Sequence, residues 1–263
     1  MNIPIAHIHG GEITEGAVDE QIRHSITKMS YLHFCSTETY RKRIIQMGEE
    51  PSRVFNSGAP GIDNIKNMKM MKKSELEKEL NWKLGSKNIL FTYHPTTLKD
   101  KKIGKEIKLI LNSLSKFDFH ILFTYANADY GGNVINKHLE IFCKRNVNKY
   151  KVVKTLGQFV YLSCMKNFDL IVGNSSSGII EAASFKKPVV NIGDRQKGRL
   201  RSLNIIDCEI KSLEKTINHA LSKSFRLKIK KVKNIYGSGK TADFIVKKIK
   251  NAKLSVIKKF KDY

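Results

Sequence analysis

Short apolar runs alternate with helix-like segments along most of the chain, and this alternation limits the possible folds more than any other feature. The apolar runs occupy residues 5–9, 32–36, 54–58, 88–94, 119–125, 150–155, 168–174 and 188–193. Between them, segments such as 19–29, 103–115 and 133–144 place apolar residues at helical spacing. Buried strands that are joined by helices form parallel sheets. The sequence therefore predicts an α/β fold with parallel sheets.

A polar stretch at 61–87 separates the apolar runs into two series, three before it and five after it. We predict a first Rossmann-like domain with its linker at 1–82, a second Rossmann-like domain at 83–240, and a C-terminal helix at 241–263 that packs back toward the first. A free-standing doubly wound sheet usually has about five or six strands. The first domain is therefore expected to be incomplete in this sequence.

The charge is strongly positive and unevenly distributed. The 263 residues include 48 Lys and Arg against 24 Asp and Glu, and residues 222–263 alone have a net charge of +12. Such a surface attracts polyanions. However, 39 of the 48 basic residues are Lys, whereas recognition of bases favours Arg. Because apolar residues keep helical spacing from Phe244 to Ile257, we predict an amphipathic helix with a solvated Lys face, and nucleic-acid binding is the weaker alternative.

Composition and cysteine usage exclude several other classes of protein. No stretch of about 18 uncharged apolar residues is present, so no membrane-spanning helix is expected, and the N-terminus shows no signal-peptide pattern. The four cysteines are widely spaced and form no CxxC pair. This argues against a disulfide framework or a zinc ribbon and favours a reducing compartment. We expect a cytoplasmic protein.

The segment VGNSSSGIIE (172–181) is the strongest local signal for a binding site. An apolar run ends there, small residues turn the chain, and a helix is expected to begin near residue 177. Exposed amides at such a turn bind anions. Gly178 allows close approach of a phosphate, Ser175 and Ser176 add hydroxyl groups, and Glu181 is placed to accept hydrogen bonds from a ribose. An ordinary serine-rich helix cap is the alternative, and the lysine that defines a P-loop is absent.

Two other loops follow apolar runs of the same series. Ligand-binding loops lie at the carboxyl ends of parallel strands, so these loops are expected beside the serine turn. Arg195 and Arg199 are placed to hold a diphosphate or to orient Glu181. His94, held at a strand end by the proline after it, is placed to donate to a phosphate or a leaving group, and Asn127 occupies the corresponding place after the next strand. A basic turn and a locally packed histidine are the alternatives.

The N-terminal segment HIHGGE (7–12) begins an unusually dense group of titratable residues. Acidic residues continue to Glu20, and helical spacing places Asp19 and Arg23 on one face, where the arginine would keep the aspartate ionised. Carboxylates paired in a crevice can remove and return a proton. Part of this acidity is the usual enrichment at a helix N-terminus. A metal site is not predicted, because a second ligand cluster is missing.

Taken together, several motifs resemble the hydrolysing UDP-N-acetylglucosamine 2-epimerases of sialic, legionaminic and related sugar pathways. The resemblance runs from about residue 3 to about residue 249 and rests on HIHGGEITEGAVDEQIRHSITK, GAPGID, YHPTT, GNSSSGIIEAASFKKPVVNIGDRQKGR and IYGSGKTADFI. It implies two Rossmann-like domains with a GT-B-like fold, the nucleotide sugar in the interdomain crevice, and a homo-oligomer. Some members have Glu where His9 stands.

The resemblance also implies a reaction and a division of roles. The C2 proton is removed, UDP is eliminated, and water adds to the glycal to give N-acetylmannosamine, with no cofactor or metal. Residues implied in substrate binding are Asn127, Phe159 along the uracil, Ser175, Ser176, Gly178, Glu181, Arg195 and Arg199. Residues implied in catalysis are His9, Glu12, Asp19 and His94, the last also as a contact to UDP.

Three alternatives stay open at this point. One is the same chemistry on UDP-N,N'-diacetylbacillosamine, and the others are a UDP-binding module without turnover and a glycosyltransferase of the same fold. The resemblance further implies an N-terminal segment of roughly 100 residues, part of a domain, that is not in this sequence. The activity of a chain of this length is therefore expected to be low.

Overall fold

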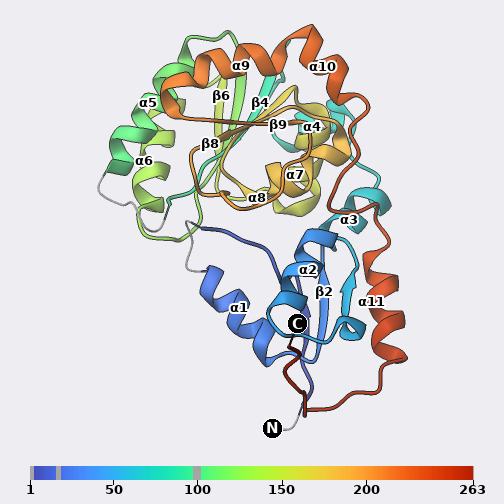
Figure 1. Cartoon of the computed structure of the whole chain (residues 1–263). Helices are drawn as coiled ribbons and strands as arrows, with labels where there is room; N and C mark the ends of the chain where they lie inside the picture. Colours follow the sequence, from blue (N-terminus) through green and yellow to red (C-terminus); the bar gives the residue numbers. More distant parts are fainter. Residues whose placement is uncertain (1–2, 16–18, 97–101, 263) are drawn as a thin grey trace. The chain divides into compact units, whose positions relative to one another are not determined.

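A computed structural model of the chain describes residues 3–15, 19–96 and 102–262. The chain forms two compact units: residues 1–67 with 234–263, and residues 68–233 (Figure 1). The sequence-based division had placed residues 68–82 with the first domain. In the structure, α4 (Lys73–Glu79) belongs to the second unit, because Leu76 and Trp82 pack in the same cluster as Leu90 and Phe168.

The second unit is a parallel, doubly wound sheet of six strands in the order β6-β5-β4-β7-β8-β9. The strands are β4 (Asn88–Thr92), β5 (His120–Thr124), β6 (Tyr150–Val153), β7 (Leu170–Gly173), β8 (Val189–Ile192) and β9 (Ile205–Cys208). The chain moves outward in one direction from β4 to β6 and then returns to the other side of β4 with β7. The topological switch point therefore lies between β4 and β7, where open α/β sheets bind ligands.

Helices cover both faces of this sheet. One face carries α5 (Ile103–Ser115), α6 (Gly132–Cys143) and α9 (Leu213–Leu221), and the other carries α4, α7 (Gly157–Asn167) and the short α8 (Ser176–Ile180) (Figure 1). The apolar spacing explains the packing: α5 buries Ile107, Ile110, Leu111 and Leu114, which recur every three or four residues, while β4 is buried along its whole length. The α/β fold predicted from the alternation is confirmed.

The first unit has a parallel sheet of three strands, β1 (Ala6–Ile8), β2 (Leu32–Cys35) and β3 (Val54–Asn56). Its helices are α1 (Asp19–Met29), α2 (Glu38–Gln46), α3 (Gly61–Asn67) and the C-terminal α11 (Thr241–Lys250). Leu32 and Phe34 of β2 pack against Ile245 of α11. The backbone amides of Thr241 and Ala242 donate to the carboxylate of Asp63 at 3.0 and 2.7 Å. The C-terminal helix is thus part of this unit.

The sequence-based interpretation missed or overextended several elements. Strand β9 and the helices α9 and α10 (Lys223–Ile229) were not predicted. The amphipathic C-terminal helix was expected to continue to Ile257, but α11 ends at Lys250. Leu254 and Ile257 lie beyond it and are 50% and 78% exposed. The tail beyond α11 forms no helix, and Lys258 and the amide of Lys261 form bonds with Glu49 and Gly48.

Two further expectations concern the whole chain. No helix among the described residues is long and apolar enough to cross a bilayer. All four cysteines, Cys35, Cys143, Cys164 and Cys208, are free thiols.

Candidate functional site

The carboxyl ends of β4 and β7 are joined by reciprocal hydrogen bonds at the switch point. The backbone amide of His94 donates to Oδ1 of Asn174 at 2.7 Å, and Nδ2 of Asn174 donates to the carbonyl of His94 at 2.8 Å. Gly173 allows this approach, because a Cβ at that position would lie 1.9 Å from the carbonyl oxygen of Thr92. The two strand ends are therefore held in one rigid edge.

His94 is a neutral hydrogen-bond donor at this edge. Its Nδ1 accepts a hydrogen bond from the backbone amide of Asn127 at 3.0 Å, so the imidazole proton is on Nε2. Burial, together with the nearby charge of Arg195, lowers the pKa of His94 to about 4. At neutral pH His94 can donate a hydrogen bond from Nε2 to a phosphate oxygen, but it holds no dissociable extra proton for a leaving group.

The serine turn is built on a hydroxyl network. Ser175 caps α8 and accepts from the amide of Ser177, and its hydroxyl lies 3.0 Å from that of Ser177. The Ser177 hydroxyl in turn shares a hydrogen bond of 2.6 Å with Tyr161 of α7. Ser177 and Tyr161 were not singled out from the sequence, because their roles depend on a contact between two helices. α8 has only five residues, so binding here depends on local donors more than on a helix dipole.

Glu181 follows α8 and is only partly exposed. Burial raises the pKa of its carboxyl group to about 7. Ligand hydroxyl groups that donate to this carboxylate would stabilise its ionised form. The side chain is therefore suited to a pair of vicinal hydroxyls, as a ribose presents.

The loop after β8 brings three long polar side chains to the same edge. Arg195 Nη1 and Gln196 Nε2 both donate to the carbonyl oxygen of Asn174, at 3.2 and 2.8 Å. Arg199 Nη1 donates to Oε1 of Gln196 at 3.1 Å. Gln196, which the sequence analysis did not name as a site residue, thus links the basic loop to the end of β7.

The remaining predicted binding residues lie on neighbouring elements of the second unit. Asn127 follows β5, and its amide nitrogen Nδ2 donates to the carboxylate of Asp129. Phe159, in α7, is 38% exposed and available to stack with a planar ligand. His94, Asn127, Asn174 and Arg195 are thus linked by contacts, and the serine turn continues directly from Asn174.

In the first unit, the loop after β1 holds a histidine–carboxylate pair. Nδ1 of His9 lies 3.0 Å from Oε1 of Glu12, and the hydroxyl of Ser36 donates to the same oxygen at 3.2 Å. Glu12 is only 1% exposed. Nearby, His7 Nδ1 contacts the hydroxyl of Thr27, and burial lowers the pKa of His7 to about 4.

Asp19 and Arg23 do not form the expected pair among the described residues. Asp19 is exposed, whereas Arg23 forms its ion pair with Glu20 at 3.4 Å. Arg23 also donates to the carbonyl of Glu12 at 3.3 Å. Arg23 instead turns toward the loop after β1, where it donates to the hydroxyl of Thr14, and Glu20 accepts from the amide of the same residue.

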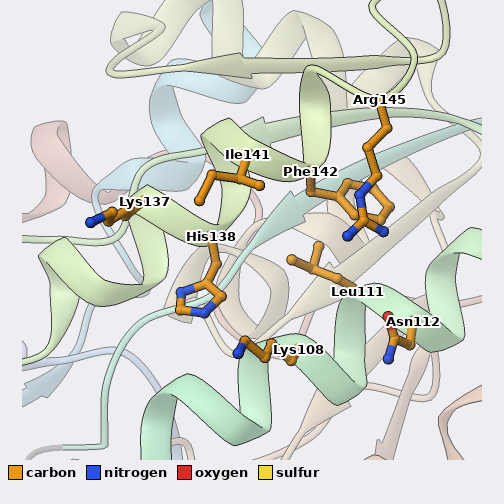
Figure 2. Close-up of a pocket in the computed structure, with 8 residues that line it drawn as sticks. All are labelled: Lys108, Leu111, Asn112, Lys137, His138, Ile141, Phe142 and Arg145. Atoms are coloured by element: carbon orange, nitrogen blue, oxygen red, sulfur yellow. The ribbon is translucent and has the colours of Figure 1, made fainter.

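A cavity of about 530 Å³ lies between the second halves of α5 and α6 (Figure 2). Leu111, Ile141 and Phe142 form its apolar floor, and Lys108 and Arg145 contribute positive charge. Crossover helices run antiparallel to the strands, so these second halves lie toward the amino ends of the strands. None of the residues predicted for binding or catalysis lines this groove. Among the described residues, no group of His, Cys, Asp and Glu side chains is arranged to hold a metal ion.

The fold and the switch-point edge define a protein of the GT-B-like class with two Rossmann-like units, as comparison with solved structures shows. UDP-GlcNAc 2-epimerase from Neisseria meningitidis bound to UDP-GlcNAc matches with a TM-score of 0.76 at 19% identity, over 95% of this chain and 70% of that one. The Methanocaldococcus jannaschii UDP-GlcNAc 2-epimerase in complex with UDP-GlcNAc and UDP matches with a TM-score of 0.76 at 22% identity, over 95% and 70%.

Sequence comparison shows the family. The family model for UDP-N-acetylglucosamine 2-epimerase matches residues 1–250, and the chain belongs to this family. A Campylobacter jejuni protein named GDP/UDP-N,N'-diacetylbacillosamine 2-epimerase (hydrolyzing) is 50% identical over 86% of this chain and 59% of its own length. Polysialic acid biosynthesis protein P7 from Escherichia coli is 38% identical over 100% of this chain and 67% of its own length. The chain thus spans roughly three-fifths of the first of these relatives.

Proposed function

We propose that this chain is a hydrolysing UDP-N-acetylglucosamine 2-epimerase, which converts UDP-GlcNAc to N-acetylmannosamine and UDP. The observation that carries the proposal is the edge at the end of β4 and β7. It places a neutral imidazole donor, a guanidinium group and a hydroxyl-rich turn together, in a chain whose family is that of the 2-epimerases.

The second unit would hold the UDP portion of the substrate. His94 Nε2 and Arg195 supply donors for the diphosphate, and Ser175 and Ser176 supply hydroxyl groups. Glu181 would accept from the ribose, and Phe159 would lie along the uracil. Asn127, Gly178 and Arg199 support these contacts from the neighbouring loops.

The loop after β1 in the first unit would act at the sugar. Removal of the C2 proton leaves its electron pair to form the C1–C2 double bond, while the C1–O bond breaks and its pair leaves with UDP. Addition of water across this double bond gives N-acetylmannosamine. His9, Glu12 and Asp19 are the candidates for the proton transfers in this sequence.

A second substrate is favoured by a specific observation. The 50% identical relative from Campylobacter jejuni is named for a diacetylbacillosamine nucleotide, so UDP-N,N'-diacetylbacillosamine is the second candidate. The chemistry at C1 and C2 is the same for both sugars, and they differ in their substituents at C4 and C6.

The test is an incubation of the full chain with each UDP-sugar in D₂O, followed by NMR. The expected result is release of one UDP per free sugar, with deuterium at C2 of the product, and the faster sugar identifies the substrate. Release of UDP without deuterium at C2 would contradict elimination. Binding of UDP without turnover would instead identify a UDP-binding module, and transfer of the sugar to an acceptor would identify a glycosyltransferase.

We also propose the compartment and the oligomeric state of the enzyme. The four free thiols suit a reducing compartment, so we place the enzyme in the cytoplasm. The family resemblance implies a homo-oligomer, which sedimentation of the purified chain would test.

A further inference from the structure

A cavity of about 550 Å³ lies at the amino ends of β7 and β8, at the opposite end of these strands from the switch-point edge. Asp169 precedes β7, Pro188 precedes β8, and residues of α10 complete the lining. Leu221, Leu227 and Ile229 contribute apolar surface. The volume is in the range of small-molecule sites, which combine an apolar lining with a few polar groups. None of the residues proposed to bind UDP or to act at the sugar lines this cavity.

Five cationic side chains and one carboxylate line the cavity, so the lining has a net charge of +4. The cations come from two separate parts of the sequence and are Lys186, Lys187, Lys223, Arg226 and Lys230. Within the described part of the chain, Arg226 alone of the five has an ion-pair partner, Asp169 at 3.4 Å. The carboxylate of Asp169 also accepts from the backbone amide of Asn88 at 2.9 Å. The positive charge of the four lysines is therefore left for a ligand or for solvent.

Lys187 carries a charge that the fold compensates only in part. Its side chain is partly buried, and this burial lowers the pKa of its ammonium group. The charge of Asp169 opposes this shift, and the nearby charge of Arg226 adds to it. The backbone of Lys187 is fixed, since its amide donates to the carbonyl of Ala182 at 3.3 Å and its carbonyl accepts from Nδ2 of Asn204 at 2.8 Å. A partly desolvated cation beside another cation costs free energy, which an anion in the cavity would offset.

We propose that this cavity is a binding site for a small organic phosphate, separate from the site at the carboxyl ends of the strands. The cationic side chains bind the phosphate, and the apolar lining around Leu221 and Ile229 holds the apolar body of the ligand. Lysine binds phosphate as a point charge, and a phosphate dianion offsets more of the +4 charge than a carboxylate does. An anionic membrane surface fits less well, because Ile229 is recessed and only 2% exposed, whereas membrane-binding surfaces project their apolar side chains.

The first test is a fluorescence titration of the full chain with naphthyl phosphate, in excess UDP so that this probe does not compete for the switch-point edge. We expect saturable binding that Lys187→Met weakens about tenfold, the value of one charge-assisted contact. Lys228→Gln is the matched control, because Lys228 is an exposed residue of α10 that does not line the cavity. Naphthol, which lacks the phosphate, and inorganic phosphate, which lacks the apolar body, should both bind more weakly. Equal affinity of the two variants would show general attraction to a basic surface and overturn the proposal.

The second test needs no variant and therefore does not depend on whether Lys187→Met folds. Pyridoxal phosphate carries an aldehyde that forms an imine with a lysine amine and releases water, and borohydride then reduces the C=N bond to a stable amine. Because the lowered pKa leaves more free amine on Lys187, peptide mass mapping should show Lys187 labelled about tenfold faster than Lys228.

Naphthyl phosphate should protect Lys187 from this label. Uniform labelling of the exposed lysines, or labelling of Lys187 that naphthyl phosphate does not slow, would overturn the proposal. Protection of Lys187 by phosphatidylglycerol vesicles but not by naphthyl phosphate would assign the cavity to a lipid headgroup and would also overturn it.

Discussion

Glu181 is the residue whose ionisation should be visible in ligand binding. Because burial raises its pKa to about 7, the group is half protonated at neutral pH, and only the ionised form accepts two ribose hydroxyls. UDP affinity should therefore rise between pH 6 and 8. At pH 8 the parent chain should bind UDP about tenfold more tightly than Glu181→Gln, the value of one charge-assisted hydrogen bond.

Calorimetric titration with UDP at several pH values checks this. Glu181→Gln is also the control, because the titration of UDP itself affects both chains equally and cancels in their ratio. A ratio that stays constant from pH 6 to 8 would mean that the carboxylate does not contact the nucleotide.

Gly173 should tolerate no side chain. Its φ is 138°, and the Cβ of Gly173→Ala would meet the backbone of Thr92 at 1.9 Å, so β4 and β7 would have to separate. We expect a loss of about 3 kcal/mol or more in the free energy of unfolding. Gly193→Ala is the matched control: it has φ of 71° but nothing within 4 Å of the Cβ, and it should cost only about 1–2 kcal/mol of conformational strain. Urea unfolding of both variants gives the comparison, and equal losses would show that the close contact is unimportant.

The candidate site shows what residue patterns can predict and what they cannot. Residues at the ends of apolar strands, such as His94 and Arg195, were predictable because parallel strands share one ligand-binding edge. The partners of those residues were not predictable from spacing. Gln196 reaches the site through a contact between the ends of neighbouring strands, and Tyr161 through a contact between two helices on one face of the sheet. Arg23 pairs with Glu20 and not with Asp19, and it also donates to the loop after β1.

At the scale of elements, the C-terminal tail stabilises the first unit through one buried carboxylate. Lys258 donates to both oxygens of Glu49 at 2.8 Å and to the carbonyl of Ser30 at 2.8 Å. Glu49 is 1% exposed and is also paired with Lys28 at 2.7 Å. Lys258 of the tail thus helps to neutralise the buried carboxylate of Glu49.

Removing this lysine should destabilise the first unit. Lys258→Met leaves the Glu49 carboxylate with one fewer cation, and we expect a loss of about 2 kcal/mol, less than for a pair left wholly uncompensated. Lys259→Met is the control, because Lys259 is exposed. Thermal unfolding measures both, and a double variant with Glu49→Gln should recover part of the loss. If Lys258→Met and Lys259→Met unfold alike, the tail does not contribute.

The strength of the periodic pattern decided which elements were predictable. Four of the five apolar runs, those that became β4, β5, β7 and β8, are almost wholly buried, and that burial leaves a clear signature in the sequence. β6 and β9 lie at the two edges of the sheet and have mixed burial patterns. β6 was still predicted from the run at 150–155, whereas the four residues of β9 were missed. Beyond Lys250 the apolar spacing persists, but the chain is no longer helical and Lys258 bonds to Glu49, a contact that a helical pattern cannot reveal.

For the whole molecule, the two units should respond differently to acid. Burial lowers the pKa of His7 and His33 in the first unit to about 4. A histidine with a depressed pKa contributes stability that is complete above the unfolded value of 6.5 and is lost as the pH falls toward 4. The pKa shift of the more buried His33 is worth on the order of 3 kcal/mol at most, and that of His7 is worth less because solvent screens it. The first unit should therefore weaken steeply between pH 7 and 4.

In the second unit, the pKa shifts of two residues have opposite effects on stability in acid. His94, with a pKa of about 4, destabilises this unit in acid in the same way. Glu181 has a raised pKa of about 7, so its effect has the other sign: relative to the unfolded chain, the folded unit gains stability as the pH falls from 7 to 4.5. The two contributions nearly cancel, and the stability of the second unit should change little in this range.

A single tryptophan makes this difference measurable. Trp82, the only tryptophan of the chain, lies in the core of the second unit, so its fluorescence reports on that unit, while far-ultraviolet circular dichroism reports on both. In urea, lowering the pH from 7 to 5 should move the first part of the dichroism transition to lower urea and leave the fluorescence midpoint almost unchanged. His33→Gln should reduce the shift in dichroism, and Glu181→Gln should make the fluorescence midpoint fall in acid. A single transition that moves equally in both signals would show that the two units unfold together, with their opposing proton linkages summed over one cooperative molecule.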